Sequence, residues 1–378
     1  MAKRLLLALL SILTAFSLSG CWNYRSLDQM SIVVGIAVDF DKETNTFDVS
    51  YEIANLSGKG KTSPITGKII HAQGKTLFEA ARNVKRRDQD KLFFGASCVL
   101  VLSHELVREV GILSLIEWFL RDAECRETMS VAISQEATAA EILQSPEESE
   151  SIMSVTIYDI LKEDKDVTGT IQNMQLYEIY NRLYSPRKSA VLPALHRVLN
   201  GKELVPEVNG AALIKGEQLV GFLPPEQSRY ILLVEGQLNS AVMTLSTSDI
   251  PGHDLSLEVL KSKAEKNYAY EGGKLILTIE SALEVALAEN RIGLDVMDKD
   301  AVKQAEEAAA RMIEGDILRL MGVLQHEFAA DVFGFGEMIY KRNLPLWHQL
   351  APSWEALYPA AEVRVSSTVH IVNAASAK

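Results

Sequence analysis

The sequence has few cysteines and no cluster of side chains that could bind a metal. Its 378 residues include three cysteines and seven scattered histidines, none at the spacing of a metal site. A structural zinc site needs about four closely spaced sulfur or imidazole ligands, so we predict no metal and no cofactor. Cys98 and Cys125 could form one disulfide outside a membrane. Because Cys98 lies in an apolar run, we favour a buried free thiol.

The sequence also lacks an excess of basic residues. It has 38 Lys and Arg against 50 Asp and Glu, which gives a net charge of -12. Proteins that bind nucleic acids present clustered Lys and Arg, so we predict no nucleic-acid partner. The same bulk charge disfavours contact between the folded body and anionic lipid headgroups. Hydrophobic residues make up 47% of the chain and charged residues 23%, which is typical of a globular protein.

Long apolar runs are missing except at the N-terminus. Two basic residues precede an apolar stretch over 5–18, which is shorter than the about 20 residues that a transmembrane helix needs. Ser19-Gly20 then precede Cys21. This order is typical of a lipoprotein signal peptide over 1–20, with Cys21 as the lipid attachment site that anchors the chain on the outer face of a membrane. The alternative is an ordinary secretory signal beside a chance cysteine, but the small residues favour lipidation.

Fragments of catalytic motifs are present, but each is incomplete. Gly58-Lys59-Gly60-Lys61-Thr62 ends like a phosphate-binding loop, yet the required earlier glycine is replaced by Asn55. His104-Glu105 and His326-Glu327 each begin a zinc-protease motif whose second histidine is missing. A complete Gly-x-Ser-x-Gly elbow is also missing from the sequence. We therefore predict that the protein is not an enzyme.

Strands and helices alternate in the first half of the chain, which predicts a mixed α/β region over 21–200 that can contain two subdomains. Residues 32–38 and 47–53 indicate a hairpin, and period-two alternation in its second strand predicts a half-buried strand. Thr76 and Glu79 indicate a capping box that opens a helix. The later expected elements are a strand over 92–102, a Ser103-capped helical region, a strand over 128–134 and a helical region over 147–184.

The second half predicts a separate α+β domain over 205–375. A long amphipathic helix is expected over 301–328, lying across an antiparallel sheet. Pro224-Pro225 indicates the start of a shorter helix. The expected strands are a hairpin over 209–223, strands over 255–264 and 275–285, and a closing strand over 362–372.

Two short segments combine charged, glycine and aromatic residues. Arg121 and Asp122 form either local ion pairs at a helix end or a partly buried Arg–Asp pair at the junction to the next strand. Asp331-Val332-Phe333-Gly334-Phe335-Gly336 precedes Trp347 and Trp354, and its glycines permit a tight break after the long helix. The tryptophans are most simply core residues, whereas an exposed aromatic patch would suit a protein partner. Either segment is a possible structural or interaction motif.

These segments together resemble the Ger(x)C family, the lipoprotein C subunits of nutrient germinant receptors in spore-forming bacteria. The resemblance covers essentially the whole chain after the signal peptide, and the order and spacing of the motifs carry it. One departure is Ala37, which stands where the family has a second glycine. The matching segments are Cys21-Trp22, 32–39, 76–80, 121–126, 209–212, 219–223, 331–336 and 345–347.

The resemblance implies a non-enzymatic, lipid-anchored receptor subunit at the spore inner membrane. Its partners would be two integral membrane proteins, the A and B subunits, and the receptor would respond to small nutrients. Of the family's functional residues only Cys21 transfers with a defined role, and direct contact with nutrient stays open. The alternatives are a lipid-anchored solute-binding protein of a transporter, which should have two α/β lobes, and a surface hydrolase, which the incomplete motifs disfavour.

Overall fold

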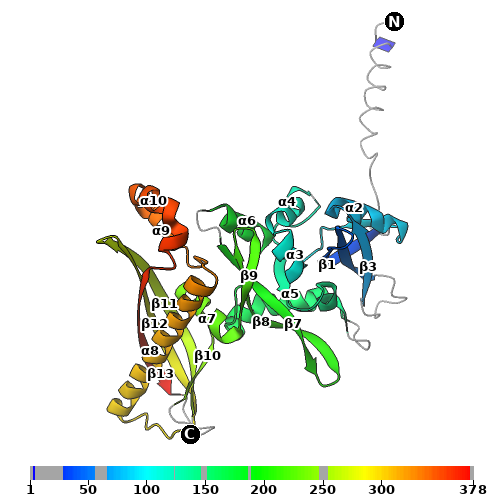
Figure 1. Ribbon diagram of the computed structural model, residues 1–378. Helices are drawn as coiled ribbons and strands as arrows, with labels where there is room; N and C mark the ends of the chain where they lie inside the picture. The colour runs from blue at the N-terminus through cyan, green and yellow to red at the C-terminus, as the bar shows by residue number, and fades with distance from the viewer. Residues whose placement is uncertain are drawn as a thin grey trace.

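The computed structural model describes residues 3–4, 29–55, 66–122, 124–145, 151–185, 189–246 and 254–374. Nearly all of the expected signal peptide, Cys21 and the phosphate-loop fragment at 58–62 lie outside the described residues. Two β-sheets lie beside each other along the length of the molecule (Figure 1). Within the described segments, no helix has the length and apolarity that crossing a membrane requires.

The first sheet has nine strands in the order β3-β2-β1-β5-β6-β7-β8-β9, with β4 paired to β1. The neighbours β1, β5, β6 and β7 run parallel, and antiparallel pairs extend both sides. Parallel neighbours require crossover connections, which here contain helices. The strands are β1 (Met30–Asp41), β2 (Thr46–Asn55), β3 (Thr66–Gly74), β4 (Lys91–Phe93), β5 (Val99–Ser103), β6 (Ser130–Ser134), β7 (Ser189–Asn200), β8 (Glu203–Lys215) and β9 (Gln218–Leu223).

The first two helical regions of this half begin at their predicted capping residues, and the region predicted over 147–184 is helical from Met153. The Thr76 hydroxyl accepts the Glu79 N–H at 3.1 Å, and Ser103 caps the next helix. Gly111 and Gly169 have φ of 86° and 64°, and this left-handed backbone divides each of the two long predicted helical regions. The predicted strand 92–102 is likewise two strands, β4 and β5. The helices are α2 (Leu77–Asn83), α3 (His104–Glu109), α4 (Leu113–Arg121), α5 (Met153–Val167) and α6 (Leu176–Tyr184).

Strand β2 is not half-buried as the alternation predicts. Glu52 lies on its supposed solvent face but is only 1% exposed, because the start of α5 covers that face. The two Glu52 carboxylate oxygens accept the Met153 N–H at 2.8 Å and the Ser154 N–H at 2.7 Å, and the Ser154 hydroxyl also donates to Glu52. The approach is close enough to require glycine nearby, since a Cβ on Gly35 would overlap the Ser154 side chain.

The second sheet has the order β10-β11-β12-β13 and carries the long predicted helix. The α+β expectation is confirmed, with one difference. The last strand, β13, runs parallel to β12, because the helical crossover returns the chain to the end where β12 began. The elements are α7 (Pro225–Val234), β10 (Val242–Ser246), β11 (Asp254–Glu271), β12 (Lys274–Asn290), α8 (Lys299–Gly322), α9 (Phe335–Arg342), α10 (Leu344–Leu350), α11 (Trp354–Leu357) and β13 (Glu362–Ala374).

The two sheets share one hydrophobic cluster. It contains Val101 and Leu213 from the first sheet, Leu257 from the second, and Ile317 from α8. Helix α7 lies where the sheets meet, with Leu232 and Leu233 in the cluster (Figure 1). The expected domain boundary at 200–205 lies between β7 and β8, which are paired along their length, and the first sheet continues to β9. That boundary stays a prediction about folding units.

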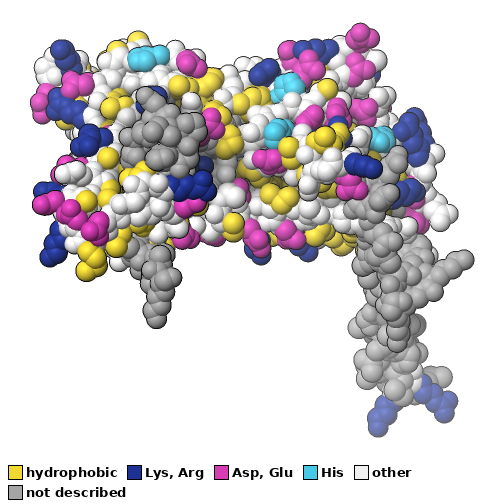
Figure 2. Space-filling model, turned by 90° about the horizontal axis from the view of Figure 1, so that it is seen from below, with side chains coloured by type: hydrophobic (Ala, Val, Ile, Leu, Met, Phe, Trp, Pro, Cys, Tyr) yellow, Lys and Arg dark blue, Asp and Glu magenta, His cyan; other side chains and the backbone are white. Residues whose placement is uncertain are grey.

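The free edge of β13 is covered by acidic side chains of α8. The Glu314 carboxylate accepts the Ser367 N–H at 2.9 Å, and the Glu306 carboxylate accepts the Ile371 N–H at 2.8 Å. An edge strand with unpaired N–H groups invites pairing with other chains, so these contacts protect the sheet. Elsewhere, Figure 2 shows acidic and basic side chains interspersed over the face seen from below.

Replacing the Glu52 carboxylate should destabilise the fold. Glu52→Ala leaves two buried N–H groups of α5 without their acceptor, and each such loss costs about 1–3 kcal/mol. We expect the unfolding free energy from urea denaturation to fall by about 3 kcal/mol. Glu43→Ala, in the exposed β1–β2 turn, is the control and should change it by less than about 0.5 kcal/mol. Equal stability of the two variants would contradict the capping role.

The same carboxylate gives stability a defined pH dependence. Burial raises the pKa of Glu52 above its ordinary value of 4.5, although the Ser154 and Met153 hydrogen bonds oppose this. Glu52 then holds a proton more tightly in the folded chain than in the unfolded chain. The stability that this proton binding contributes is present below pH 4.5 and is lost as pH rises through the folded pKa. We expect the stability difference between wild type and Glu52→Gln to decrease over that rise, measured by denaturation at several pH values. A stability difference that increases with pH would contradict the raised pKa of Glu52.

Candidate functional site

The predicted tight break after the long helix forms one wall of a cleft. Helix α8 continues into a wide turn over Val323–Glu327, after which Ala329 and Gly334 adopt φ of 47° and 69°. These left-handed residues turn the chain sharply into α9. The short helices α9, α10 and α11 then lie at one end of the second sheet (Figure 1).

Asp331 fixes the start of α9. Its side chain is 5% exposed, and its two oxygens accept the Phe335 N–H at 2.9 Å and the Gly336 N–H at 2.7 Å. The backbone N–H groups of a first helical turn have no partner within the helix, so a carboxylate is well suited to them. The role of Asp331 is thus to position the helix.

Gly336 provides the surface on which two indole rings rest. A Cβ at this position would lie 3.0 Å from the Trp354 ring and 3.1 Å from the Trp347 ring. The two ring centroids are 5.3 Å apart in an edge-to-face arrangement, and Tyr358 lies 5.9 Å from Trp354. Both tryptophans are partly buried and pack against the core. The two rings therefore lie at the border of the core, packed against it on one side and lining the cleft on the other.

The opposite wall of the cleft comes from the first sheet. The Lys215 ammonium group at the end of β8 lies 2.6 Å from the Glu355 carboxylate of α11, and Phe328 packs against Gly221 of β9. The cleft between these contacts has a volume of about 710 Å³. Its lining includes Ser189, Lys215, Gln218, Val220, Asp331, Trp347, Trp354, Glu355 and Tyr358.

A partly buried ion pair supports the loop beneath the cleft, and sequence reasoning missed it. The Lys266 ammonium group of β11 lies 3.0 Å from the Glu235 carboxylate at the end of α7, and it donates to the Phe333 carbonyl at 3.0 Å. The Lys266 side chain is 18% exposed. A lone lysine in an alternating strand gives no local signal for this role, because its partners lie about 30 and 70 residues away.

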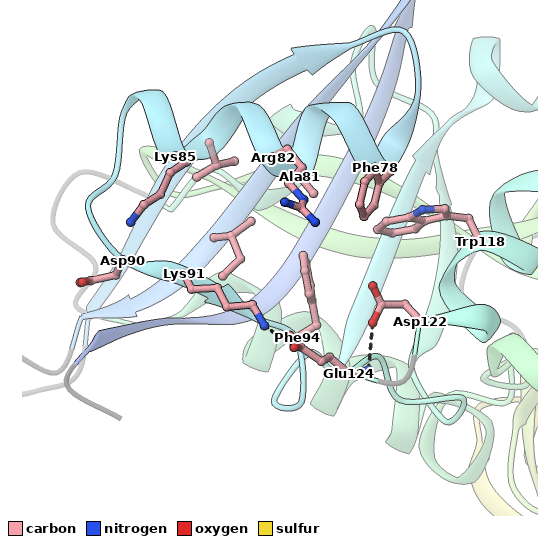
Figure 3. Close-up of a pocket in the computed structure, with 12 residues that line it drawn as sticks. Phe78, Ala81, Arg82, Lys85, Asp90, Lys91, Phe94, Trp118, Asp122 and Glu124 are labelled. Atoms are coloured by element: carbon pink, nitrogen blue, oxygen red, sulfur yellow. Dashed lines mark hydrogen bonds and ion pairs between the residues drawn. The ribbon is translucent and has the colours of Figure 1, made fainter. Parts of the chain in front are cut away.

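The other predicted segment is separate from this cleft. Arg121 is 79% exposed and donates to Glu117 at 3.0 Å, one helical turn away, and Asp122 accepts the Glu124 N–H at 2.9 Å. The local-pair interpretation is therefore correct, and the partly buried Arg–Asp pair is not observed. Asp122 lines a second cavity of about 460 Å³ beside α2 (Figure 3). Helix α4 lies well apart from α9 and α10 (Figure 1).

The two described cysteines are free, as favoured from the sequence. The Cys98 thiol donates to the Val34 carbonyl at 3.3 Å. Burial raises the pKa of Cys98 to about 11 and that of Cys125 to about 12. Both thiols are thus protonated at neutral pH, which makes them weak nucleophiles. Among the residues that the structure describes, no group of three or more His, Cys, Asp or Glu side chains could hold a metal ion.

Two family models together match nearly the whole described chain. Residues 23–197 match the spore germination protein N-terminal domain, and residues 209–374 match the "Spore germination B3/GerAC like, C-terminal" model. The chain belongs to the Ger(x)C family. The family matches leave out Cys21, which precedes the first matched residue.

Individual relatives of this Ger(x)C protein are distant but cover nine tenths or more of its length. Spore germination protein B3 of Bacillus subtilis (strain 168) is 24% identical over 371 residues, which cover 94% of each chain. Spore germination protein A3 of the same organism is 25% identical and covers 90% of each chain. The crystal structure of the GerBC protein matches with a TM-score of 0.60 at 20% identity, covering 90% of this chain and 97% of that one. This structural match establishes the shared fold.

Crowding the glycine beneath the indoles should disrupt the cleft. Gly336→Val forces the Trp347 and Trp354 rings apart, because even one Cβ is in tight contact with both. We expect a loss of near-UV circular dichroism and a destabilisation of about 1–3 kcal/mol. The matched control is Gly322→Val on α8, where a Cβ meets nothing within 4 Å. An unchanged near-UV spectrum in Gly336→Val would contradict the packing described.

Proposed function

We propose that this protein is a lipid-anchored, non-catalytic subunit of a nutrient germinant receptor. In this proposal it acts with two integral membrane subunits, A and B, at the spore inner membrane to trigger germination. The observation that carries the proposal is the combination of Cys21 after a short apolar run with membership of a spore germination family. The similarity to spore germination proteins B3 and A3, over 94% and 90% of this chain, supports it.

The proposed anchor holds the folded body close to its partners. Residues 21–28 separate Cys21 from Gln29, the first residue of the described body. Eight residues span at most about 29 Å, so β1 would start within that distance of the membrane. Two acyl chains are sufficient for stable anchoring. Contacts with integral membrane subunits are then made by a body whose distance from the bilayer is limited.

The aromatic cleft is our candidate for a contact with a partner subunit. It is lined by Trp347 and Trp354, and aromatic anchors in pockets contribute strongly to protein interfaces. The solute-binding alternative expects two similar α/β lobes. It is disfavoured because the second sheet has four strands and carries one long helix beside β13.

Cys21→Ala tests the anchor. In the native host we expect the variant to lose acylation and quantitative membrane association, and nutrient-triggered germination to weaken while non-nutrient triggers still work. The measurements are labelled fatty-acid incorporation, membrane fractionation and germination assays. Cys98→Ala is the matched control, because this partly buried thiol lies in the folded body and should carry no lipid.

The outcomes separate the tether from the receptor role. A Cys21→Ala protein that stays fully membrane-bound in cells without the A and B subunits would refute the tether. If the wild-type protein is acylated normally but a strain lacking it germinates on nutrients as well as the wild type, the receptor role would be refuted. Neighbouring reading frames for a multi-span protein and a transporter-like protein would agree with the proposal, whereas an ATP-binding cassette gene would favour the solute-binding alternative.

A further inference from the structure

One surface of this acidic protein carries a local excess of positive charge. It lies on and after α2, and we call it the α2 basic surface. The segment 75–91 holds six exposed basic residues against three acidic ones, although the whole chain has a net charge of -12. The members of the α2 basic surface are Lys75, Arg82, Lys85, Arg86, Arg87 and Lys91.

Most of these charges have no ion-pair partner within the described part of the chain, although Asp90, Asp122 and Glu124 line the same cavity. No described carboxylate lies within 4.0 Å of the charged nitrogens of Arg82, Lys85 or Arg86, whereas Lys91 pairs with Glu124. The Lys85 ammonium group donates to the Gln89 carbonyl, which leaves its charge in place. Exposed charges of one sign within a Debye length of about 8 Å act together on a charged partner.

Apolar and aromatic side chains accompany the charges. Phe78 of α2 is 53% exposed, and the Arg82 guanidinium carbon lies 4.8 Å from the centre of its ring. Beside them is the cavity of about 460 Å³, lined by Phe78 and Arg82 of α2 and by Lys85 of the turn that follows it (Figure 3). Leu92 and Trp118 also line it. An exposed aromatic ring flanked by basic side chains is the composition of segments that lie in a membrane interface.

The α2 basic surface is also tied to the point where the N-terminal segment enters the fold. Met30, the first residue of β1, pairs with Lys91 of β4. The Ser31 hydroxyl donates to the Asp88 carboxylate at 3.0 Å, which joins the same two segments again. The residues between Cys21 and Gln29 span at most about 29 Å, so an anchor at Cys21 keeps this surface near the bilayer.

We propose that the α2 basic surface lies against anionic lipid headgroups, with Phe78 at the interface, and gives the protein a second membrane contact beside its anchor. This inference rests on the proposed anchor only for the position of the bilayer. The acidic bulk composition argues against such a contact, but lipid surfaces act over about a Debye length and therefore sense local charge. Charge complementarity and proximity to the anchor favour a lipid surface over a soluble anion.

The test uses the mature chain, residues 21–378, with Cys21→Ala so that no lipid is attached. Binding is measured by co-flotation with phosphatidylglycerol vesicles and with phosphatidylcholine vesicles, at low and high salt. We expect salt-sensitive binding to the anionic vesicles alone. The triple change Arg82→Gln, Lys85→Gln, Arg86→Gln should weaken that binding by about tenfold to a hundredfold, since each basic side chain near a surface contributes roughly fivefold. Phe78→Ser should remove the part of the binding that persists at high salt.

The matched control removes three exposed charges at the other end of the molecule, with Lys263→Gln, Lys303→Gln and Arg311→Gln. It should change vesicle binding by less than about threefold, and circular dichroism should establish that both triple variants are folded. Equal loss in both triple variants, or equal binding to both vesicle types, would overturn the inference. So would a triple variant that binds vesicles normally but no longer co-purifies with membrane proteins, because the surface would then face protein. Vesicle binding without acylation at Cys21 in cells would refute the anchor alone, and acylation without vesicle binding would refute this inference alone.

Discussion

The arrangement of the first sheet depends on one buried contact, the carboxylate of Glu52 against the first turn of α5. The residue before that helix, Ile152, has no side chain that could cap it. The carboxylate arrives instead from β2, about a hundred residues earlier in the chain. Leaving two buried N–H groups unpaired would cost about 2–6 kcal/mol, a large part of the stability of an ordinary domain. The contact therefore fixes where α5 sits on β2, and with it the buried face of that strand.

Carboxylates also accept pairs of backbone N–H groups at other junctions of the fold. Asp39, at the end of the family's first-strand motif, accepts the Ala139 and Ala140 N–H groups at 2.7 and 3.1 Å. Asp164 accepts the Thr170 and Ile171 N–H groups and closes the turn after α5. Asp331 accepts the Phe335 and Gly336 N–H groups at the start of α9. Part of the acidic excess of this chain thus lies inside it as backbone acceptors, and buried carboxylates that are hydrogen-bonded in this way are compatible with a stable core.

These contacts also explain which parts of the fold could be predicted. The capping residues Thr76 and Ser103 act within their own helix turn, so a local pattern was enough to find them. Glu52 has the spacing of a solvent-facing residue, and only the distant α5 makes that face internal. Gly111 and Gly169 were visible in the sequence, but the apolar periodicity continues across them and hid the breaks. The segment with Asp331 and Gly336 was found from its glycines and aromatic residues, whereas the roles of these two residues as a cap and as a ring platform require the folded backbone.

The shared core has a consequence for how an anchored subunit would present its cleft. A single tether of eight residues leaves a body free to rotate, so it limits distance without setting orientation. Two sheets that contribute to one hydrophobic cluster behave as a single unit, since independent motion is expected only across small or polar interfaces. An orientation imposed near β1 is therefore carried through the cluster to α9 and α10 at the other sheet. A second contact beside the tether would remove the rotation, and the aromatic cleft would then face its partners at a fixed height and angle.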